Sequence, residues 1–311
     1  MSSAIPDPSS DTPSPAGGPE PNRRQRASKP SEIIGGLVLV ATPIGNADDI
    51  SSRALGLLAT ADIVACEDTR VTSKLFAVHG LKTPLLSYHE HNAAQQRPKL
   101  IKRLKDGETV ALVSDAGMPT ISDPGFKLIN ACVDEGIALT CIPGASAVTT
   151  ALALSGLPTD RFFFQGFLPS KKTQRRKVLG EIGRIPGSLV VMESAKRLAA
   201  MLADAADILG PRACAVTREL TKRFEEVRRG TLGELAQHYD DSGPPKGEIT
   251  LVIGPPGADE TATTGEQVDA LLREALVNSS VRDAAAEVAA MTGWPKRDVY
   301  QRALSIEKDT V

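Results

Sequence analysis

Short runs of aliphatic and β-branched residues recur between longer amphipathic segments in the first half of the chain. The apolar runs are residues 37–40, 63–66, 109–113 and 139–142. Helical patterns occupy residues 73–79, 126–135 and 145–155, and each of them is followed by a glycine. Strands that alternate with helices of this length are typical of a largely parallel sheet covered by helices. We expect Thr72 to cap the first of these helices.

The pattern changes near residues 156–165, and a second alternating series follows. Its apolar runs are residues 188–192, 212–216 and 248–253, separated by helical patterns at 196–208 and 232–239. The last unit has helical patterns only, at residues 266–277, 281–291 and 295–307, and it is similar to a helix-turn-helix. We therefore predict an α/β fold class with two α/β domains, residues 33–157 and 158–256, and a helical unit at 264–308.

Residues 1–32 have a different composition. Seven prolines alternate there with serines, glycines and a few charged residues. Such a segment buries too little apolar surface to offset the entropy lost on ordering, so we expect a disordered tail. It lacks the apolar core of a signal peptide, and no run in the chain reaches the roughly 18 apolar residues of a membrane span. These features and four cysteines without a C-x-x-C pair favour a cytoplasmic protein with free thiols and no membrane partner.

Small, turn-forming or acidic residues follow each of the four strands predicted first. The loops are residues 41–46, 67–70, 114–125 and 143–147. Because the carboxyl ends of parallel strands form the edge where ligands bind, these loops favour an enzyme over a scaffold. None of them matches G-x-G-x-x-G or G-x-x-x-x-G-K-[ST], which argues against pyrophosphate binding of the Rossmann or phosphate-loop kind. A cofactor here should need main-chain contacts and an apolar slot.

Acidic residues and histidines near these strand ends are candidates for chemistry. Glu67 and Asp68 could act as a general base beside the cation of Arg70, or they could only stabilise a helix N-terminus. His89 and His91 share one face of a strand, but no third ligand follows at metal spacing. We therefore predict no metal.

A basic segment follows a cluster of phenylalanines in the middle of the chain. Residues 171–177 carry five positive charges and no acid, and Phe162, Phe163, Phe164 and Phe167 lie just before them. Basic side chains near aromatic rings suit a phosphate backbone and an unstacked base, although a solvated helix start has the same composition. The net charge of −2 does not decide between them, because a local patch can be hidden in a balanced total. The C-terminal helices carry nearly balanced charge, so both a packing module and a nucleic-acid binder stay open there.

Six motifs in order resemble one known family. They are Val40-Ala-Thr-Pro-Ile-Gly-Asn46, Cys66-Glu-Asp-Thr-Arg70, Ser87-Tyr-His-Glu-His-Asn92, residues 113–125 with Ser-Asp-Ala-Gly-Met-Pro, Ile142-Pro-Gly-Ala-Ser-Ala147 and Lys246-Gly-Glu-Ile249. Together they are similar to the bacterial ribosomal RNA small-subunit methyltransferase I family, which has the tetrapyrrole-methylase (class III) fold. The resemblance covers about residues 33–255, and the C-terminal helices resemble the helix-turn-helix unit of that family.

The resemblance implies an enzyme that uses S-adenosylmethionine for 2′-O-methylation of a cytidine ribose in the decoding region of 16S rRNA. It also implies a homodimer whose substrate is the small ribosomal subunit, with the cofactor in the cleft between the two α/β domains. By match to the motifs, the expected cofactor-binding residues are Pro43, Ile44, Asp115, Met118, Pro119, Ser146, Ala147, Met192, Leu220 and Gly247. The expected RNA-binding residues are Arg70, Lys171, Lys172, Arg175, Arg176 and Lys177.

Methyl transfer from such a cofactor needs few catalytic groups. A sulfonium cofactor is already activated, so the enzyme holds the ribose oxygen in line with the methyl group and assists loss of the hydroxyl proton. The candidates for that proton are Glu67, Asp68, Glu219 and Lys222, and the sequence does not choose among them. The alternatives are a porphyrin or corrin C-methyltransferase of the same fold and a non-catalytic ribosome-assembly factor. The basic segment disfavours the first, since an anionic macrocycle does not need it, and the strand-end loops disfavour the second.

Overall fold

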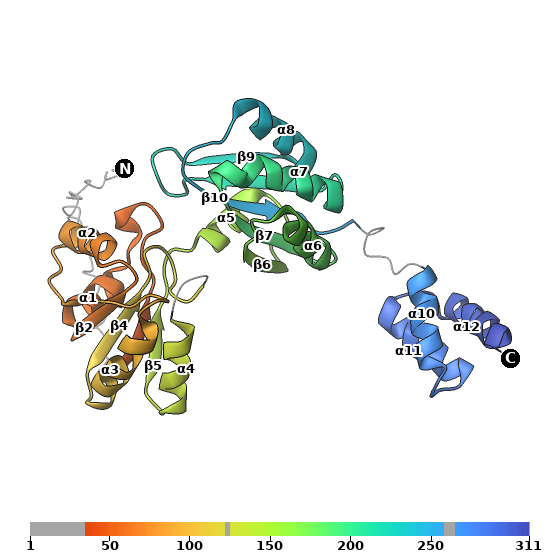
Figure 1. The fold of residues 1–311 in the computed structure, drawn as a ribbon, viewed down its shortest axis with the longest axis horizontal. Helices are drawn as coiled ribbons and strands as arrows, with labels where there is room; N and C mark the ends of the chain where they lie inside the picture. Colours follow the sequence, from red (N-terminus) through yellow and green to blue (C-terminus); the bar gives the residue numbers. More distant parts are fainter. Residues whose placement is uncertain (1–34, 122–124, 258–264, 311) are drawn as a thin grey trace, which may run out of the picture. The chain divides into compact units, whose positions relative to one another are not determined.

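The computed structural model describes residues 35–121, 125–257 and 265–310, and Figure 1 draws their fold. The tail predicted at residues 1–32 lies outside these ranges. Within them, two five-stranded sheets are followed by a group of three helices. No helix in the described ranges combines the length and the apolar character that crossing a bilayer requires.

The first sheet is parallel throughout, as the alternating pattern predicts. Its order is β3-β2-β4-β1-β5, and every neighbouring pair runs in the same direction. The strands are β1 (Gly36–Val40), β2 (Ile63–Cys66), β3 (Leu85–Ser87), β4 (Thr109–Val113) and β5 (Leu139–Ile142). The helices between them are α1 (Ser52–Thr60), α2 (Thr69–His79), α3 (Ala93–Lys105) and α4 (Phe126–Asp134), with a short 3₁₀ helix at Ala47–Asp49. The four predicted loops therefore leave this sheet at one edge.

The second sheet is mixed, with the order β6-β7-β10-β8-β9. Only β6 and β7 are parallel, and the other neighbours are antiparallel. The strands are β6 (Phe162–Phe167), β7 (Ser188–Ser194), β8 (Ala213–Arg218), β9 (Glu226–Thr231) and β10 (Glu248–Ile253). The helices are α6 (Lys172–Ile182), α7 (Leu198–Leu209) and α8 (Leu232–Ser242), with a 3₁₀ helix at Ala195–Arg197. Figure 1 shows α7 and α8 side by side along this sheet, and their apolar side chains build its core with Leu189, Val191 and Leu251.

Helix α5 (Ala147–Ser155) follows the first sheet in sequence but packs on the second. Val148 and Leu152 lie in one apolar cluster with Val252 of β10. Arg229 of β9 also donates to the carbonyl oxygens of Leu154 and Ser155 at the end of this helix. The boundary predicted at residue 157 therefore assigns α5 to the first domain, although the helix packs on the second sheet. Because α5 has apolar residues on several faces, it also buries apolar side chains against the second sheet.

The start of α2 differs from the prediction. The helix begins at Thr69, and Asp68 rather than Thr72 is its N-cap, with the Asp68 carboxylate accepting from the Arg70 backbone N–H at 2.8 Å. Thr72 is buried within the first turns. Aspartate and threonine are both good caps, and the side chain that reaches the free N–H groups from extended backbone decides between them. This correction changes the interpretation of Asp68 below.

The C-terminal helices form a cluster of their own. They are α10 (Gly265–Ala275), α11 (Val281–Thr292) and α12 (Lys296–Thr310). Val268, Leu272, Val288 and Val299 are fully or almost fully buried among them. Ser280 caps α11 by accepting from the Asp283 N–H, and Gly293 ends it at a φ of 71°. Gly293 takes that left-handed conformation with little strain, which allows the sharp turn into α12.

Candidate active site

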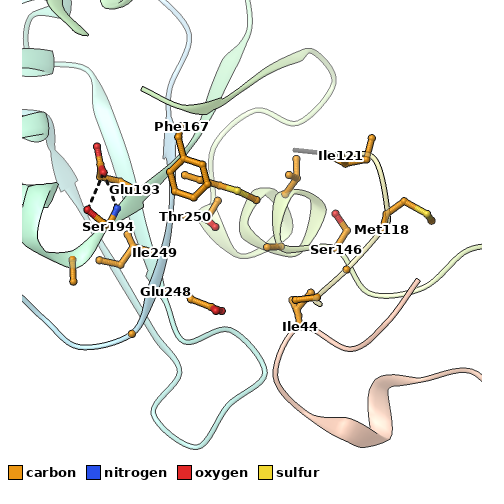
Figure 2. A pocket seen from close by; sticks show the side chains of 17 residues that line it. Ile44, Met118, Ile121, Ser146, Phe167, Glu193, Ser194, Glu248, Ile249 and Thr250 are labelled. Carbon is orange, nitrogen blue, oxygen red and sulfur yellow. Dashed lines mark hydrogen bonds between the residues drawn. The ribbon is translucent and has the colours of Figure 1, made fainter. Parts of the chain in front are cut away.

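A pocket of about 440 Å³ lies at the carboxyl edge of the first sheet and is also lined by β7 and β10. Apolar side chains line it from two sides, with Ile44 after β1 and Met118 after β4 on one and Phe167 at the end of β6 on the other (Figure 2). Ser146 and, from the second sheet, Glu248 and Thr250 add polar groups to the lining. A mostly apolar pocket of this size with a few placed polar groups is typical of a small-molecule site.

The Glu193 side chain is fixed beneath this lining. It is fully buried, Arg197 binds one of its oxygens at 3.0 Å, and the Ser194 N–H donates to the other at 2.7 Å. The carboxylate therefore holds the end of β7 to the 3₁₀ helix Ala195–Arg197 and does not offer an acceptor to the pocket.

Backbone hydrogen bonds lock two of the strand-end loops together. Thr42 and Gly117 exchange N–H···O bonds of 2.9 and 3.0 Å, and the Thr42 hydroxyl donates to the Ser114 carbonyl oxygen at 3.0 Å. Gly117 sits at a φ of 78°, which a residue with a side chain rarely adopts. The loops after β1 and β4 consequently present Ile44 and Met118 from one rigid support.

The connection between β8 and β9 reaches the loop after β1. Thr221 has a φ of 64°, and its hydroxyl accepts from the Asn46 N–H at 3.0 Å. A β-branched residue in this conformation is strained, and strain of this kind clusters at functional sites. The connection thereby fixes Glu219 and Lys222 near the pocket.

Lys222 lies between two carboxylates at the rim of this pocket. Its Nζ is 2.9 Å from Glu219 Oε1 and 3.0 Å from Glu248 Oε2. Burial by itself would lower the pKa of Lys222, but the hydrogen bonds to Glu219 and Glu248 outweigh it and raise the pKa. The hydrogen bond from Lys222, helped by the backbone N–H of Glu248, lowers the pKa of Glu219. Lys222 and Glu219 are therefore both ionised at neutral pH.

A second pocket, of about 450 Å³, lies at the ends of β2, β3 and β4. Its lining is polar and consists of Glu67, Asp68, Thr69, Arg70, Ser87, His89, His91 and Asp115. Within the described ranges, no three acidic, histidine or cysteine side chains are arranged to hold a metal ion. Asp115 and Ala116 are adjacent in sequence and line different pockets, so the loop after β4 separates the two.

Asp68 has a structural role that the sequence left open. Both of its oxygens bind the Arg70 guanidinium, at distances from 2.5 to 3.1 Å. Hydrogen bonds from the Arg70 side chain and backbone lower the pKa of Asp68 to about 2. A carboxylate that is capped, paired and this acidic is a poor general base. Of the two interpretations of residues 67–70, the one that applies to Asp68 is the acid that stabilises the N-terminus of a helix.

The structure distributes the predicted cofactor residues unevenly. Six of them line the first pocket, namely Ile44, Met118, Ser146, Ala147, Met192 and Gly247. Asp115 lines the second pocket instead. Leu220 packs under the first pocket, in one cluster with Ile44 and Val148, and Pro43 and Pro119 are buried without lining either pocket.

The prediction that Arg175 binds RNA is wrong. Its side chain is only 6% exposed, and the Nε and Nη2 atoms donate to Asp204 Oδ2 at 2.8 and 2.6 Å. Arg176 is held by Asp204 and Asp207. The amphipathic start of α6 turns Arg175 inward, so its guanidinium is not presented to a phosphate. Lys171, Lys172 and Lys177 stay exposed, as does Arg70.

Phe167, Thr250 and Ile121 are pocket residues that the sequence analysis missed. Phe167 belongs to the phenylalanine cluster that we associated with RNA, and it is 60% exposed and lines the pocket. Thr250 directly follows the motif Lys246-Gly-Glu-Ile249, so its position next to that motif was a usable signal. Strand ends of a mixed sheet carry no general rule for ligand binding, which is why the second sheet was hard to interpret.

Comparisons with known proteins agree with this geometry. Residues 36–236 match the family described as Tetrapyrrole (Corrin/Porphyrin) Methylases, and residues 262–307 match the RsmI C-terminal HTH domain. The chain is 48% identical over 275 residues to a Mesorhizobium japonicum protein named Ribosomal RNA small subunit methyltransferase I, covering 88% of this chain and 92% of that one. A Bacillus subtilis protein of the same name is 39% identical over 287 residues, covering 89% of this chain and 97% of its own length.

Solved structures with low sequence identity share the fold. Diphthine synthase has a TM-score of 0.55 at 19% identity, with 70% of this chain and 89% of that chain covered. Uroporphyrin-III C-methyltransferase from Thermus thermophilus, in complex with S-adenosylhomocysteine, has a TM-score of 0.50 at 19% identity, with coverage of 71% and 97%. At this identity the likeness concerns the fold of the two α/β domains alone.

Proposed function

This chain belongs to the ribosomal RNA small subunit methyltransferase I family, and from that premise we propose that it transfers a methyl group from S-adenosylmethionine to 16S rRNA. We propose the 2′-oxygen of a cytidine in the decoding region as the acceptor. The observation that carries the proposal is the first pocket, which lies beside a second, polar pocket large enough for part of a nucleotide. Two neighbouring sites are what a transfer between cofactor and substrate requires.

The residues of the first pocket fit S-adenosylmethionine. Ile44, Met118 and Phe167 offer apolar surface for a flat ring, while the Ser146 hydroxyl offers a polar contact. When bound, the cofactor supplies a methyl group on a sulfonium, which needs no further activation. We propose that Met192, Ala147 and Gly247 complete this site.

The remaining task of the protein is to orient the ribose and to help remove its hydroxyl proton. Holding two reactants in line contributes much of the rate of such a transfer. Of the four predicted proton acceptors, Asp68 is tied to Arg70 and Lys222 is already protonated between two carboxylates. Glu219 is bound by Lys222 in the same way as Asp68 is bound by Arg70, and we propose Glu67, which lines the second pocket, as the acceptor.

The direct test is incubation with labelled S-adenosylmethionine and small ribosomal subunits. We expect the label in 16S rRNA at a ribose 2′-oxygen of a cytidine, and none in protein. Label on a base carbon, or on a porphyrin offered in competition, would favour the C-methyltransferase alternative. The carboxylates of Glu67, Asp68 and Asp115 speak against that alternative, because they would repel an anionic macrocycle.

Replacing Lys171, Lys172 and Lys177 by alanine should weaken RNA binding and flatten its dependence on salt. Each lysine that contacts a phosphate releases counterions, with a slope of about −0.7 per phosphate of a single strand. Filter binding at several salt concentrations measures both quantities. S-adenosylmethionine affinity should stay the same, because none of these side chains lines the first pocket.

The matched control removes Lys99, Lys102 and Lys105 of α3, which changes the net charge equally elsewhere on the surface. If both triple variants lower the salt slope alike, the effect is one of total charge and the α6 segment has no special role.

Among the C-terminal basic residues, Arg302 is bound by Asp269 at 2.7 and 2.8 Å, so it is a packing residue. We propose Lys296 and Arg297, which are exposed at the start of α12, as the RNA-binding residues of this helical unit.

We also propose that the protein is a cytoplasmic homodimer, with α4 and β5 at the interface. Phe126, Val133 and Leu139 are exposed apolar side chains on these two elements, and β5 is an edge strand. Exposed large apolar side chains on neighbouring elements are a feature of interaction sites.

Val133→Asp should therefore raise the Kd of the dimer by about tenfold or more, since a charge at an interface is costly to desolvate. Sedimentation at several protein concentrations measures the Kd. Val78→Asp on α2 is the control, because Val78 is 65% exposed and Val133 is 62% exposed. Equal sedimentation of the two variants would place the interface elsewhere.

A further inference from the structure

The second pocket has the lining of a site that recognises a polar, flat ligand. Acceptors and donors face it together, since carboxylates of Asp68 and Asp115 occur with the Ser87 hydroxyl and the imidazole of His89. His89 Nδ1 is buried and has no hydrogen-bond partner among the described residues. Buried polar atoms normally have a partner, so the His89 ring keeps a hydrogen-bonding group that the described residues do not use. Imidazole rings, such as the neighbouring His91, also stack on nucleobases.

The Asp115 carboxylate is a hydrogen-bond acceptor with a fixed orientation in this pocket. Its Oδ1 atom accepts from the Asp68 N–H at 3.1 Å, which fixes the orientation of the carboxylate. No hydrogen bond joins its Oδ2 atom to any residue in the described ranges. The Asp68 carboxylate, in contrast, is occupied by Arg70 at both oxygens. An oriented carboxylate with one open oxygen suits an N–H donor of a ligand.

The position of the pocket relates this ligand to the transfer. Asp115 and Ala116 are consecutive residues that line the second and the first pocket, respectively. A group in the second pocket is therefore next to the proposed cofactor site. Enzymes that modify a nucleotide commonly take its base out of the stack and bind the Watson–Crick edge in a pocket.

We propose that the second pocket receives the pyrimidine base of the target nucleotide, with the Asp115 carboxylate accepting a hydrogen bond from the exocyclic amine of cytosine. This assignment rests on the proposed function, because it names the part of the substrate that selects the methylated ribose. A carboxylate that accepts from cytosine N4 discriminates against uracil, which has a carbonyl oxygen at that position. His89 and Ser87 lie in the same lining and can donate to the ring acceptors.

The test compares cytidine and uridine at the position that the wild-type protein labels, in small subunits reconstituted from either RNA. Asp115→Asn keeps the oxygen that accepts from the Asp68 N–H and turns the open oxygen into an amide donor. We expect the ratio of methylation rates, cytidine over uridine, to fall by about tenfold or more in this variant. The rise of Tm with S-adenosylmethionine should equal that of the wild type, which also shows that the variant is folded.

Glu90→Gln is the matched control, because Glu90 is an exposed acid between His89 and His91 that does not line the pocket. Its cytidine-to-uridine ratio should equal that of the wild type. An unchanged ratio in Asp115→Asn would overturn the inference, as would a loss of S-adenosylmethionine binding, which would return Asp115 to the cofactor site. If the wild-type protein labels neither RNA, it is the proposed function that fails.

Discussion

Gly247→Ala is expected to abolish S-adenosylmethionine binding and to lower the free energy of unfolding by about 3 kcal/mol. Gly247 has a φ of 101°, and a Cβ there would overlap the side chain of Glu219. Glu219 has little freedom to move away, because it binds Lys222 and accepts from the Glu248 N–H at 3.0 Å. The substitution therefore disturbs Glu248, which lines the first pocket.

Thermal unfolding with and without S-adenosylmethionine measures both effects. A ligand at about 100 times its Kd contributes about 2.7 kcal/mol, which the variant should lose. Gly243→Ala is the matched control, since its φ is also positive, at 74°, but no atom of the described residues lies within 4 Å of an added Cβ. The control should be destabilised only by the backbone conformation and should still bind the cofactor. If the two variants behave alike, crowding against Glu219 has no part in the effect.

Asp204→Ala should lower the free energy of unfolding by about 3–5 kcal/mol, because it leaves the Arg175 guanidinium buried without its counter-ion. Asp204 is 3% exposed and lies on α7, and it binds both Arg175 and Arg176 of α6. The loss is a large fraction of the 5–15 kcal/mol that typically separates folded from unfolded protein. Urea unfolding, followed by far-UV circular dichroism, measures it.

Asp207→Ala provides the comparison for this pair. Asp207 also binds Arg176, but its side chain is 66% exposed. Exposed ion pairs contribute about 0–1 kcal/mol, so this variant should unfold almost as the wild type does. Equal destabilisation by the two substitutions would mean that burial of the α6–α7 pair is unimportant. It would also reopen Arg175 as an RNA contact.

The sequence by itself determined the parallel sheet and the place of the ligand-binding loops. Apolar runs that alternate with helices predict parallel strands, and residues such as Ile44, Met118 and Ser146 follow those strands at one edge. The C-terminal helices were also predictable. Ser280 caps the start of α11 and Gly293 ends it, and both are local capping signals that need no distant partner. The six motifs likewise identified the family, because each motif is a short continuous stretch of sequence.

Only the tertiary structure decided the roles that depend on distant partners. The sequence pattern of residues 171–177 is the same whether Arg175 faces solvent or Asp204, and packing of α6 on α7 made the choice. Asp115 occurs in a motif beside Met118, yet the fold of the loop after β4 places the two in different pockets. The pocket residues Phe167 and Thr250 come from a mixed sheet, whose pairing is non-local. Charge and hydropathy along the chain describe each residue's own preference, whereas burial and pairing are set by elements far away in sequence.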